Sequence, residues 1–280
     1  MNSFNFKLRW LGFILYFAVL FTLPFGFLAD LTGTLVGLSL FIVSLIFLKV
    51  TGKIRIITKL KLNKIYPADI QGLFASLSSY AHRLEIPLPE VYLLRSPGLN
   101  IGCFSLSKKE SLIFITEGLI DKLPRAELIA LIVRTLVEIK SAQLRNLSWL
   151  SQFLILLERP TTMDYVQNRS HTRRFYPFSV FVRQLVLYPL SWIPIHLIGV
   201  KEKPELMDEM TSFLIGDRRA LSEAFRRMEA TRERTPLFIP FSYHSLFLVS
   251  AECIDPIAKI FVKSHSLNDR IFQLEGRGLT

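Results

Sequence analysis

The sequence predicts an α+β membrane protein, in which an N-terminal transmembrane helical hairpin precedes a mainly helical cytoplasmic domain with a small antiparallel sheet. Residues 11–48 hold a single charged side chain, Asp30. The residues that follow alternate between helical periodicity and short runs rich in β-branched and aromatic residues. Because hydrophobic residues make up 50% of the 280 residues, the composition also excludes a disordered chain.

Asp30 divides the apolar run into two segments, 11–29 and 31–48. Each is close to the roughly 20 residues that a helix needs to cross a bilayer. Since backbone amides in lipid must be satisfied within the segment, we expect two helices joined by a turn at Asp30. A cleaved signal peptide is a poorer interpretation, because its apolar core would be too long and a second apolar segment follows at once.

Basic residues flank both ends of this hairpin. Lys7 and Arg9 precede it, and six more follow it before the first acid at Asp69: Lys49, Lys53, Arg55, Lys59, Lys61 and Lys64. The positive-inside rule therefore places both ends in the cytoplasm. The same residues supply much of the net charge of +11 and predict contact with anionic lipid headgroups. Nucleic acid is not an expected partner, because no helix-turn-helix or RNP-like pattern is present.

We divide the chain into the hairpin (1–50), a basic juxtamembrane linker (51–66) and a domain (67–280) with a hydrophobic, membrane-associated insertion at about 144–200. The expected elements of the domain are a helix opened by Pro67, strands at 90–95, 101–105 and 112–116, a helix from Pro124, one amphipathic helix at 205–229 and a short helix at 268–274. In the insertion, 147–157 is too short to span a bilayer and 178–200 contains Arg183. We therefore expect a re-entrant or interfacial pair rather than two spans.

Several motifs occur in a fixed order along the domain. They are Val91-Tyr92, Ser96-Pro97, Asn100, the run Ile-Phe-Ile-Thr-Glu-Gly-Leu at 113–119, Glu127-Leu128, residues 208–221, and Ser264-His265-Ser266 followed by Arg270-Ile271 and Leu274. Together with the hairpin, this order resembles the HtpX family of membrane zinc metallopeptidases. The resemblance implies a zincin-like domain, a location in the bacterial inner (plasma) membrane with the bulk of the protein in the cytoplasm, and a connection with proteolysis.

The catalytic motif of that family, H-E-x-x-H on one helix, is altered at every functional position. The two histidines fall on Arg134 and Glu138, and the catalytic glutamate falls on Thr135. The third zinc ligand, a glutamate four residues before Asp208, falls on Pro204. Arginine and proline offer no side-chain donor to a metal, and threonine cannot replace a carboxylate base. Zinc is therefore expected for the family but not for this chain, for which we expect no cofactor.

Two interpretations of the altered site remain open. Glu138, Asp208 and the possible cleft residue His265 could converge as mixed ligands of a metal. Alternatively, Arg134 and Glu138 are spaced i and i+4 and form an ion pair. We favour the ion pair, because a guanidinium at the centre of the site repels a metal cation. The Thr135 hydroxyl is expected to bond to a backbone carbonyl of its own helix.

The sequence therefore predicts a pseudoenzyme, a non-catalytic binding or regulatory protein in membrane-protein quality control. The resemblance implies that Asn100, Ile101 and Gly102 form the edge of the substrate cleft. There an exposed strand can hold a peptide from an unfolded or membrane protein by main-chain hydrogen bonds. Two alternatives stay open: an active membrane metalloendopeptidase with a non-standard site, and an anionic-lipid-binding or assembly protein.

Overall fold

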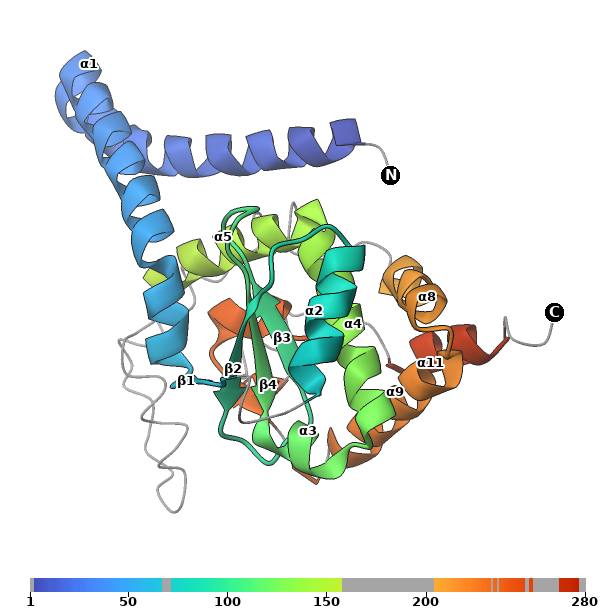
Figure 1. The fold of residues 1–280 in the computed structure, drawn as a ribbon. Coiled ribbons are helices and arrows are strands. Elements are labelled where there is room, and N and C mark those ends of the chain that lie inside the picture. Colours follow the sequence, from blue (N-terminus) through green and yellow to red (C-terminus); the bar gives the residue numbers. More distant parts are fainter. Residues whose placement is uncertain are drawn as a thin grey trace.

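The computed structural model describes residues 3–66, 72–157, 204–232, 234–235, 237–249, 252–253 and 267–276. The first helix, α1 (Ser3–Lys59), folds back on itself beside an α/β body (Figure 1). Its helical torsions are interrupted at Ala29 and Asp30, where Asp30 has a φ of 49°. Gly33 allows the two arms to approach, since a Cβ there would lie within 1.9 Å of the Phe25 carbonyl oxygen. The turn of the hairpin thus lies at Asp30, as the sequence predicts.

The stretch Leu8–Lys59 is long and apolar enough to cross a membrane. Large apolar side chains project from it into the surroundings, and those near the turn are the most exposed: Phe27 at 88%, Leu28 at 83% and Leu31 at 73%. So large an apolar surface is unusual on a soluble protein and marks a site of contact with membrane or protein.

The body is built around a four-stranded sheet in the order β1-β2-β4-β3. Its strands are β1 (Asn63–Lys64), β2 (Glu90–Leu94), β3 (Ile101–Phe104) and β4 (Leu112–Thr116). The prediction of an antiparallel sheet is wrong for one pair, because β2 and β4 run parallel. The reason is the strand order: β4 turns back antiparallel on β3 and pairs its other edge with β2, so it lies at the centre of the sheet. Because β2 and β3 lie on opposite edges of β4, β2 can run parallel to it without a direct turn between the two strands.

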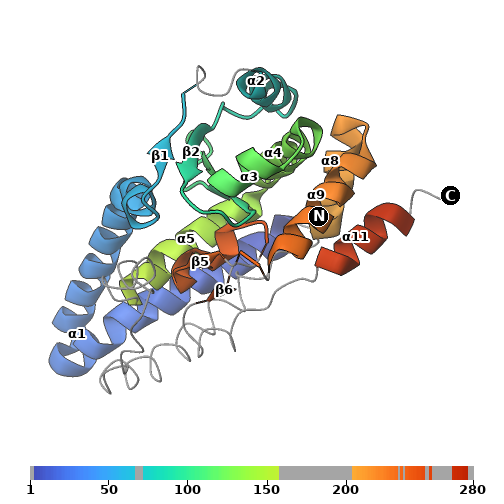
Figure 2. The ribbon, with the colours of Figure 1, turned by 90° about the horizontal axis from the view of Figure 1, so that it is seen from below.

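Helices pack around this sheet, so the body as a whole is mainly helical (Figure 2). They are α2 (Leu73–Arg83), α3 (Glu117–Lys122), α4 (Arg125–Lys140), α5 (Ala142–Leu157), α8 (Pro204–Ile215), α9 (Arg218–Arg232), the 3₁₀ helix η1 (Phe241–Leu246) and α11 (Leu267–Gly276). A short parallel pair, β5 (Phe238–Ile239) and β6 (Glu252–Cys253), lies apart from the main sheet. The single helix predicted at 205–229 is wrong, because Gly216, with a φ of 74°, separates α8 from α9.

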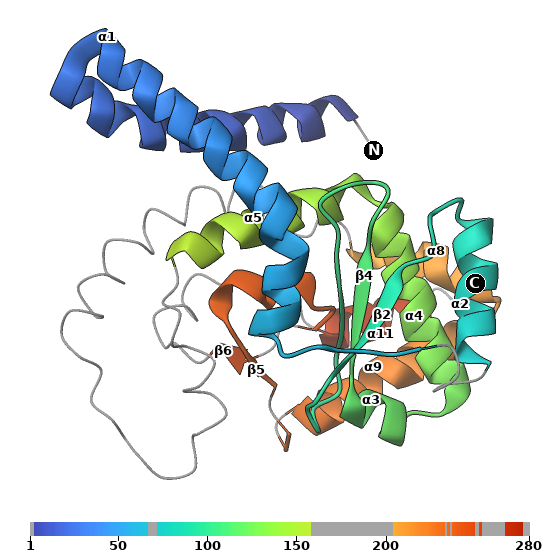
Figure 3. The same cartoon turned by 60° about the vertical axis from the view of Figure 1, so that its left-hand side comes forward.

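Helix α5 lies between the hairpin and the rest of the body (Figures 1 and 3). The Trp10 and Trp149 rings lie 6.2 Å apart, and Phe17 stacks on Phe153 with 4.2 Å between ring centroids. Phe41 and Leu48, from the second arm of α1, belong to the same buried cluster. The apolar segment 147–157 therefore packs on both arms of α1. The second predicted segment, 178–200, lies outside the described residues.

Candidate functional site

Three helices that are distant in sequence bring four charged side chains together inside the body. Arg134 and Glu138 come from α4, Asp208 from α8 and Arg270 from α11. On α11, Arg270 follows the same spacing as Leu267, Ile271 and Leu274, all of them buried. On α11, the helical spacing that buries the apolar side chains thus also directs Arg270 into the body.

Asp208 is the centre of this cluster. Arg134 donates from Nε to Asp208 Oδ1 at 2.5 Å. Arg270 donates from Nε to Oδ2 at 2.7 Å and from Nη2 to Oδ1 at 2.8 Å, which is the two-pronged arrangement that guanidinium and carboxylate favour. Arg134 also donates from Nη1 to Glu138 Oε2 at 3.1 Å, so the ion pair predicted between these two residues is confirmed. The Arg270 guanidinium stacks 4.3 Å from the centre of the Phe225 ring.

The cluster is almost completely shielded from solvent. Its members are only 1–4% exposed: Arg134 1%, Asp208 1%, Glu138 4% and Arg270 4%. Burial alone would raise the pKa of the Asp208 carboxyl, but Arg270 and Arg134 outweigh it and hold that pKa below its usual range. Burial alone would lower the pKa of Arg134, whereas Asp208 and Glu138 raise it. Both shifts favour the charged forms of Asp208 and Arg134.

The other residues aligned with the zinc site offer no replacement chemistry. The Thr135 hydroxyl donates to the Leu131 carbonyl oxygen at 2.8 Å, as predicted for a helical threonine. Pro204 begins α8 and is buried. His265 lies outside the described residues. Glu138 and Asp208 are both bound by Arg134, through Nη1 and Nε respectively.

A zinc ion does not fit the site residues that the structure describes. Its donors there would be the carboxylates of Glu138 and Asp208, and each is already bound to Arg134, whose permanent positive charge repels a metal cation. Within the described ranges, no group of three or more His, Cys, Asp or Glu side chains could hold a metal ion. We derive no metal-dependent step for this arrangement.

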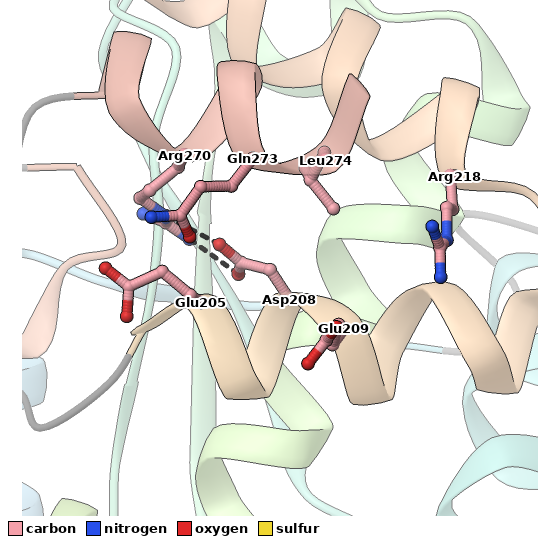
Figure 4. Close-up of a pocket in the computed structure, with 7 residues that line it drawn as sticks. All are labelled: Glu205, Asp208, Glu209, Arg218, Arg270, Gln273 and Leu274. Atoms are coloured by element: carbon pink, nitrogen blue, oxygen red, sulfur yellow. Dashed lines mark hydrogen bonds and ion pairs between the residues drawn. The ribbon is translucent and has the colours of Figure 1, made fainter. Parts of the chain in front are cut away.

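A small hollow opens beside the cluster, between α8 and α11 (Figure 4). It is lined by Glu205, Asp208, Glu209, Arg218, Arg270, Gln273 and Leu274. Its volume is about 10 Å³, which is close to the space of one water molecule.

The outer edge of β3, expected to be exposed, is paired with the chain itself. Gly102 forms an antiparallel bridge with Phe247, and the Leu248 amide donates to the Ile101 carbonyl oxygen at 2.8 Å. The Asn100 side chain donates to the Val249 carbonyl oxygen at 2.9 Å. Ile101 is fully buried. The expectation of an open peptide-binding edge at Asn100, Ile101 and Gly102 is therefore corrected: the backbone groups that a peptide would use already have partners.

Arg270 is the member of the cluster that sequence reasoning missed. The motif around 270–271 contributes to the family resemblance, but its arginine was not assigned to the site. A charge at an apolar position of a helix is the signal that could have found it, since such a charge is buried only with a partner. What the sequence could not supply was the identity of that partner, Asp208, 62 residues away along the chain.

Comparisons with known proteins agree with the resemblance in the sequence. The chain is 25% identical over 216 residues to a Protease HtpX homolog of Acaryochloris marina, covering 75% of this chain and 73% of that protein. It is 22% identical to a Protease HtpX homolog of Nostoc punctiforme, covering 83% and 82%, and 20% identical to one of Pelotomaculum thermopropionicum, covering 75% and 77%. No family model and no solved structure matches the chain. These similarities support an HtpX-like family.

Proposed function

We propose that this chain is a membrane-anchored, HtpX-like pseudopeptidase that acts as a non-catalytic binding or regulatory protein in membrane-protein quality control. One observation carries the proposal: the Arg134 guanidinium is bound between Glu138 and Asp208 in a buried cluster. Arg134 and Glu138 stand where the resembled family has its two zinc-binding histidines. Ion pairs of Arg134 thus replace the metal in holding α4 and α8 together.

Membrane anchoring is supported by the long apolar helix α1 and by its exposed side chains. Basic residues lie at both ends of the hairpin, and such residues are retained on the cytoplasmic side of a membrane. We infer that both ends of α1 and the body face the cytoplasm, and that the membrane is the bacterial inner (plasma) membrane. The turn at Asp30 would then face the opposite side.

Unfolded or membrane-protein segments are the partners that the proposal favours. They would not add a strand to β3, because residues 247–249 already occupy that edge. A surface other than this edge must therefore recognise them. The proposal makes the body a receptor for such segments rather than an enzyme that cleaves them.

Zinc content and proteolysis test the proposal together. The native chain, purified in detergent and loaded with zinc, is compared with the variant Arg134→His, Thr135→Glu, Glu138→His, Pro204→Glu. A matched control carries the same changes except Thr135→Glu. We expect no bound zinc in the native chain, zinc in both variants, and cleavage of an unfolded protein substrate only in the variant that has the general base.

Zinc content reports metal binding, and substrate cleavage reports catalysis, so the two are tested separately. One zinc per molecule in the native chain, or zinc-dependent cleavage by it, would overturn the proposal. That result would favour an active metalloendopeptidase with Glu138, Asp208 and His265 as candidate ligands. A native chain without zinc, whose variants gain it, would support a fold that keeps the site of the family but has lost its metal.

A further inference from the structure

We propose that Lys108 and Lys109, at the tip of the loop between β3 and β4, bind anionic lipid headgroups at the base of the hairpin. The base is the part of α1 around Gly52, where the second arm meets the body. The inference rests on the proposed anchoring of α1 in a membrane. It adds a contact surface on the body, separate from the basic end of α1 that the sequence already indicates.

The β3–β4 loop is fixed between α1 and α5. The Ser105 amide donates to Ser148 Oγ of α5 at 3.0 Å. The next residue, Leu106, lies against Gly52 of α1, where an added Cβ would come within 2.5 Å of Leu106 Cδ1. The loop thus extends to the side of the body on which α1 and α5 meet (Figures 1 and 3).

The loop is closed by its own hydrogen bonds, which leave its tip exposed. The Ser105 hydroxyl donates to the Ser107 carbonyl oxygen at 2.6 Å and also lies 2.9 Å from that of Glu110. The side chains of Lys108 and Lys109 are exposed, as is that of Glu110. A short loop held at both ends therefore presents two adjacent ammonium groups and one carboxylate.

The two helices that hold the loop each carry a further basic residue. Lys49 is exposed directly after the second apolar arm, three residues before Gly52. Arg145 is half-buried on α5, three residues before Ser148. On α1, exposed apolar side chains flank Lys49, with Ile46 at 59% and Val50 at 70%. An apolar surface bordered by basic side chains is complementary to a bilayer that contains anionic lipid.

The selectivity of the protein for anionic lipid is the quantity to measure. The full chain is reconstituted in phosphatidylcholine vesicles, and its association with spin-labelled phosphatidylglycerol is compared with that of spin-labelled phosphatidylcholine by electron paramagnetic resonance. The variant Lys108→Ala, Lys109→Ala is compared with Lys122→Ala, Arg125→Ala. The control removes two exposed cations beyond the opposite end of β4, Lys122 at the end of α3 and Arg125 at the start of α4.

We expect the native chain to prefer phosphatidylglycerol and the loop variant to lose about two- to fivefold of that preference, whereas the control keeps it. The preference should also fall in high salt, because exposed charges are screened. An unchanged preference in the loop variant, or an equal loss in the control, would overturn the proposal. If the native chain restricts the motion of neither labelled lipid, the hairpin is not embedded in the bilayer. That result would overturn the proposed anchoring on which the lipid-binding proposal rests. If the loop variant loses the preference for phosphatidylglycerol but still restricts lipid motion, the two lysines bind headgroups and are not needed for anchoring.

Discussion

Two clusters in this molecule have the same arrangement, a carboxylate between two cations, but one is buried and the other lies at the surface. In the buried cluster, Asp208 lies between Arg134 and Arg270 on three helices. In the surface cluster, Glu90 of β2 lies 2.6 Å from Lys53 Nζ and 3.2 Å from Lys64 Nζ, and the side chains are 35–45% exposed. Water can replace a lost partner at the surface but not in the core. Loss of one ion pair should therefore be costly in the buried cluster and tolerated in the surface cluster.

Breaking the buried cluster at Arg134 should have the largest effect. Arg134→Met removes the cation that balances Glu138 and weakens the hold on Asp208, so we expect the free energy of unfolding to fall by about 3–5 kcal/mol. Denaturant unfolding in detergent micelles measures it. The double variant Arg134→Met, Glu138→Leu leaves Asp208 paired with Arg270 and should recover much of the loss. A double variant as unstable as the single one would contradict this account of charge balance.

Removing Arg270 should cost somewhat less, because Asp208 keeps Arg134. Arg270→Ala loses both bonds to Asp208 and the stacking on Phe225, and we expect a loss of about 2–3 kcal/mol. Arg270→Lys keeps the charge but not the two-pronged geometry, so it should recover only part of that loss. Full recovery in the lysine variant would show that charge alone matters there.

The surface cluster should give the smallest effect, visible mainly through pH. The hydrogen bond from Lys53 lowers the pKa of Glu90 to about 2, with Tyr92 and Lys64 contributing and burial opposing the shift. Since the folded-state pKa lies below the ordinary value of 4.5, the stabilisation is complete above about pH 4.5 and is lost as the pH falls towards 2. At neutral pH we expect Glu90→Gln to cost less than about 1 kcal/mol, because these side chains are exposed and screened.

Thermal unfolding of the native chain and of Glu90→Gln between pH 7 and pH 2 measures this contribution. The two midpoints should differ slightly at pH 7 and converge near pH 2. A difference that grows towards low pH would have the wrong sign for a carboxylate with a lowered pKa. High salt at pH 7 should also bring the two midpoints together.

Sequence patterns predicted those features that depend on neighbouring residues. The turn at Asp30 follows from one charge in a long apolar run, and the ion pair of Arg134 with Glu138 follows from their spacing on a single helix. The helix break at Gly216 is not predicted, because the apolar spacing continues across it. A single residue in the left-handed region ends a helix without changing that spacing.

Features that depend on distant segments could not be predicted in the same way. The position of β4 between β2 and β3 depends on a pairing with β2, from which it is separated along the chain by β3. Occupation of the β3 edge by residues 247–249 depends on the path of the chain after α9, about 150 residues from β3. In both cases the local pattern allowed more than one pairing, and packing selected one.

The hairpin and the absence of the H-E-x-x-H residues follow from the sequence, because both are properties of residues close together in the chain. The pairing of Arg270 and Arg134 with Asp208, and the pairing of the outer edge of β3 with residues 247–249, are visible only in the folded chain. A buried charge must find its partner wherever the fold provides one, and a strand edge must pair with whatever segment packs beside it. Those partners lie far apart in the sequence, and only the packed body brings them within hydrogen-bonding distance.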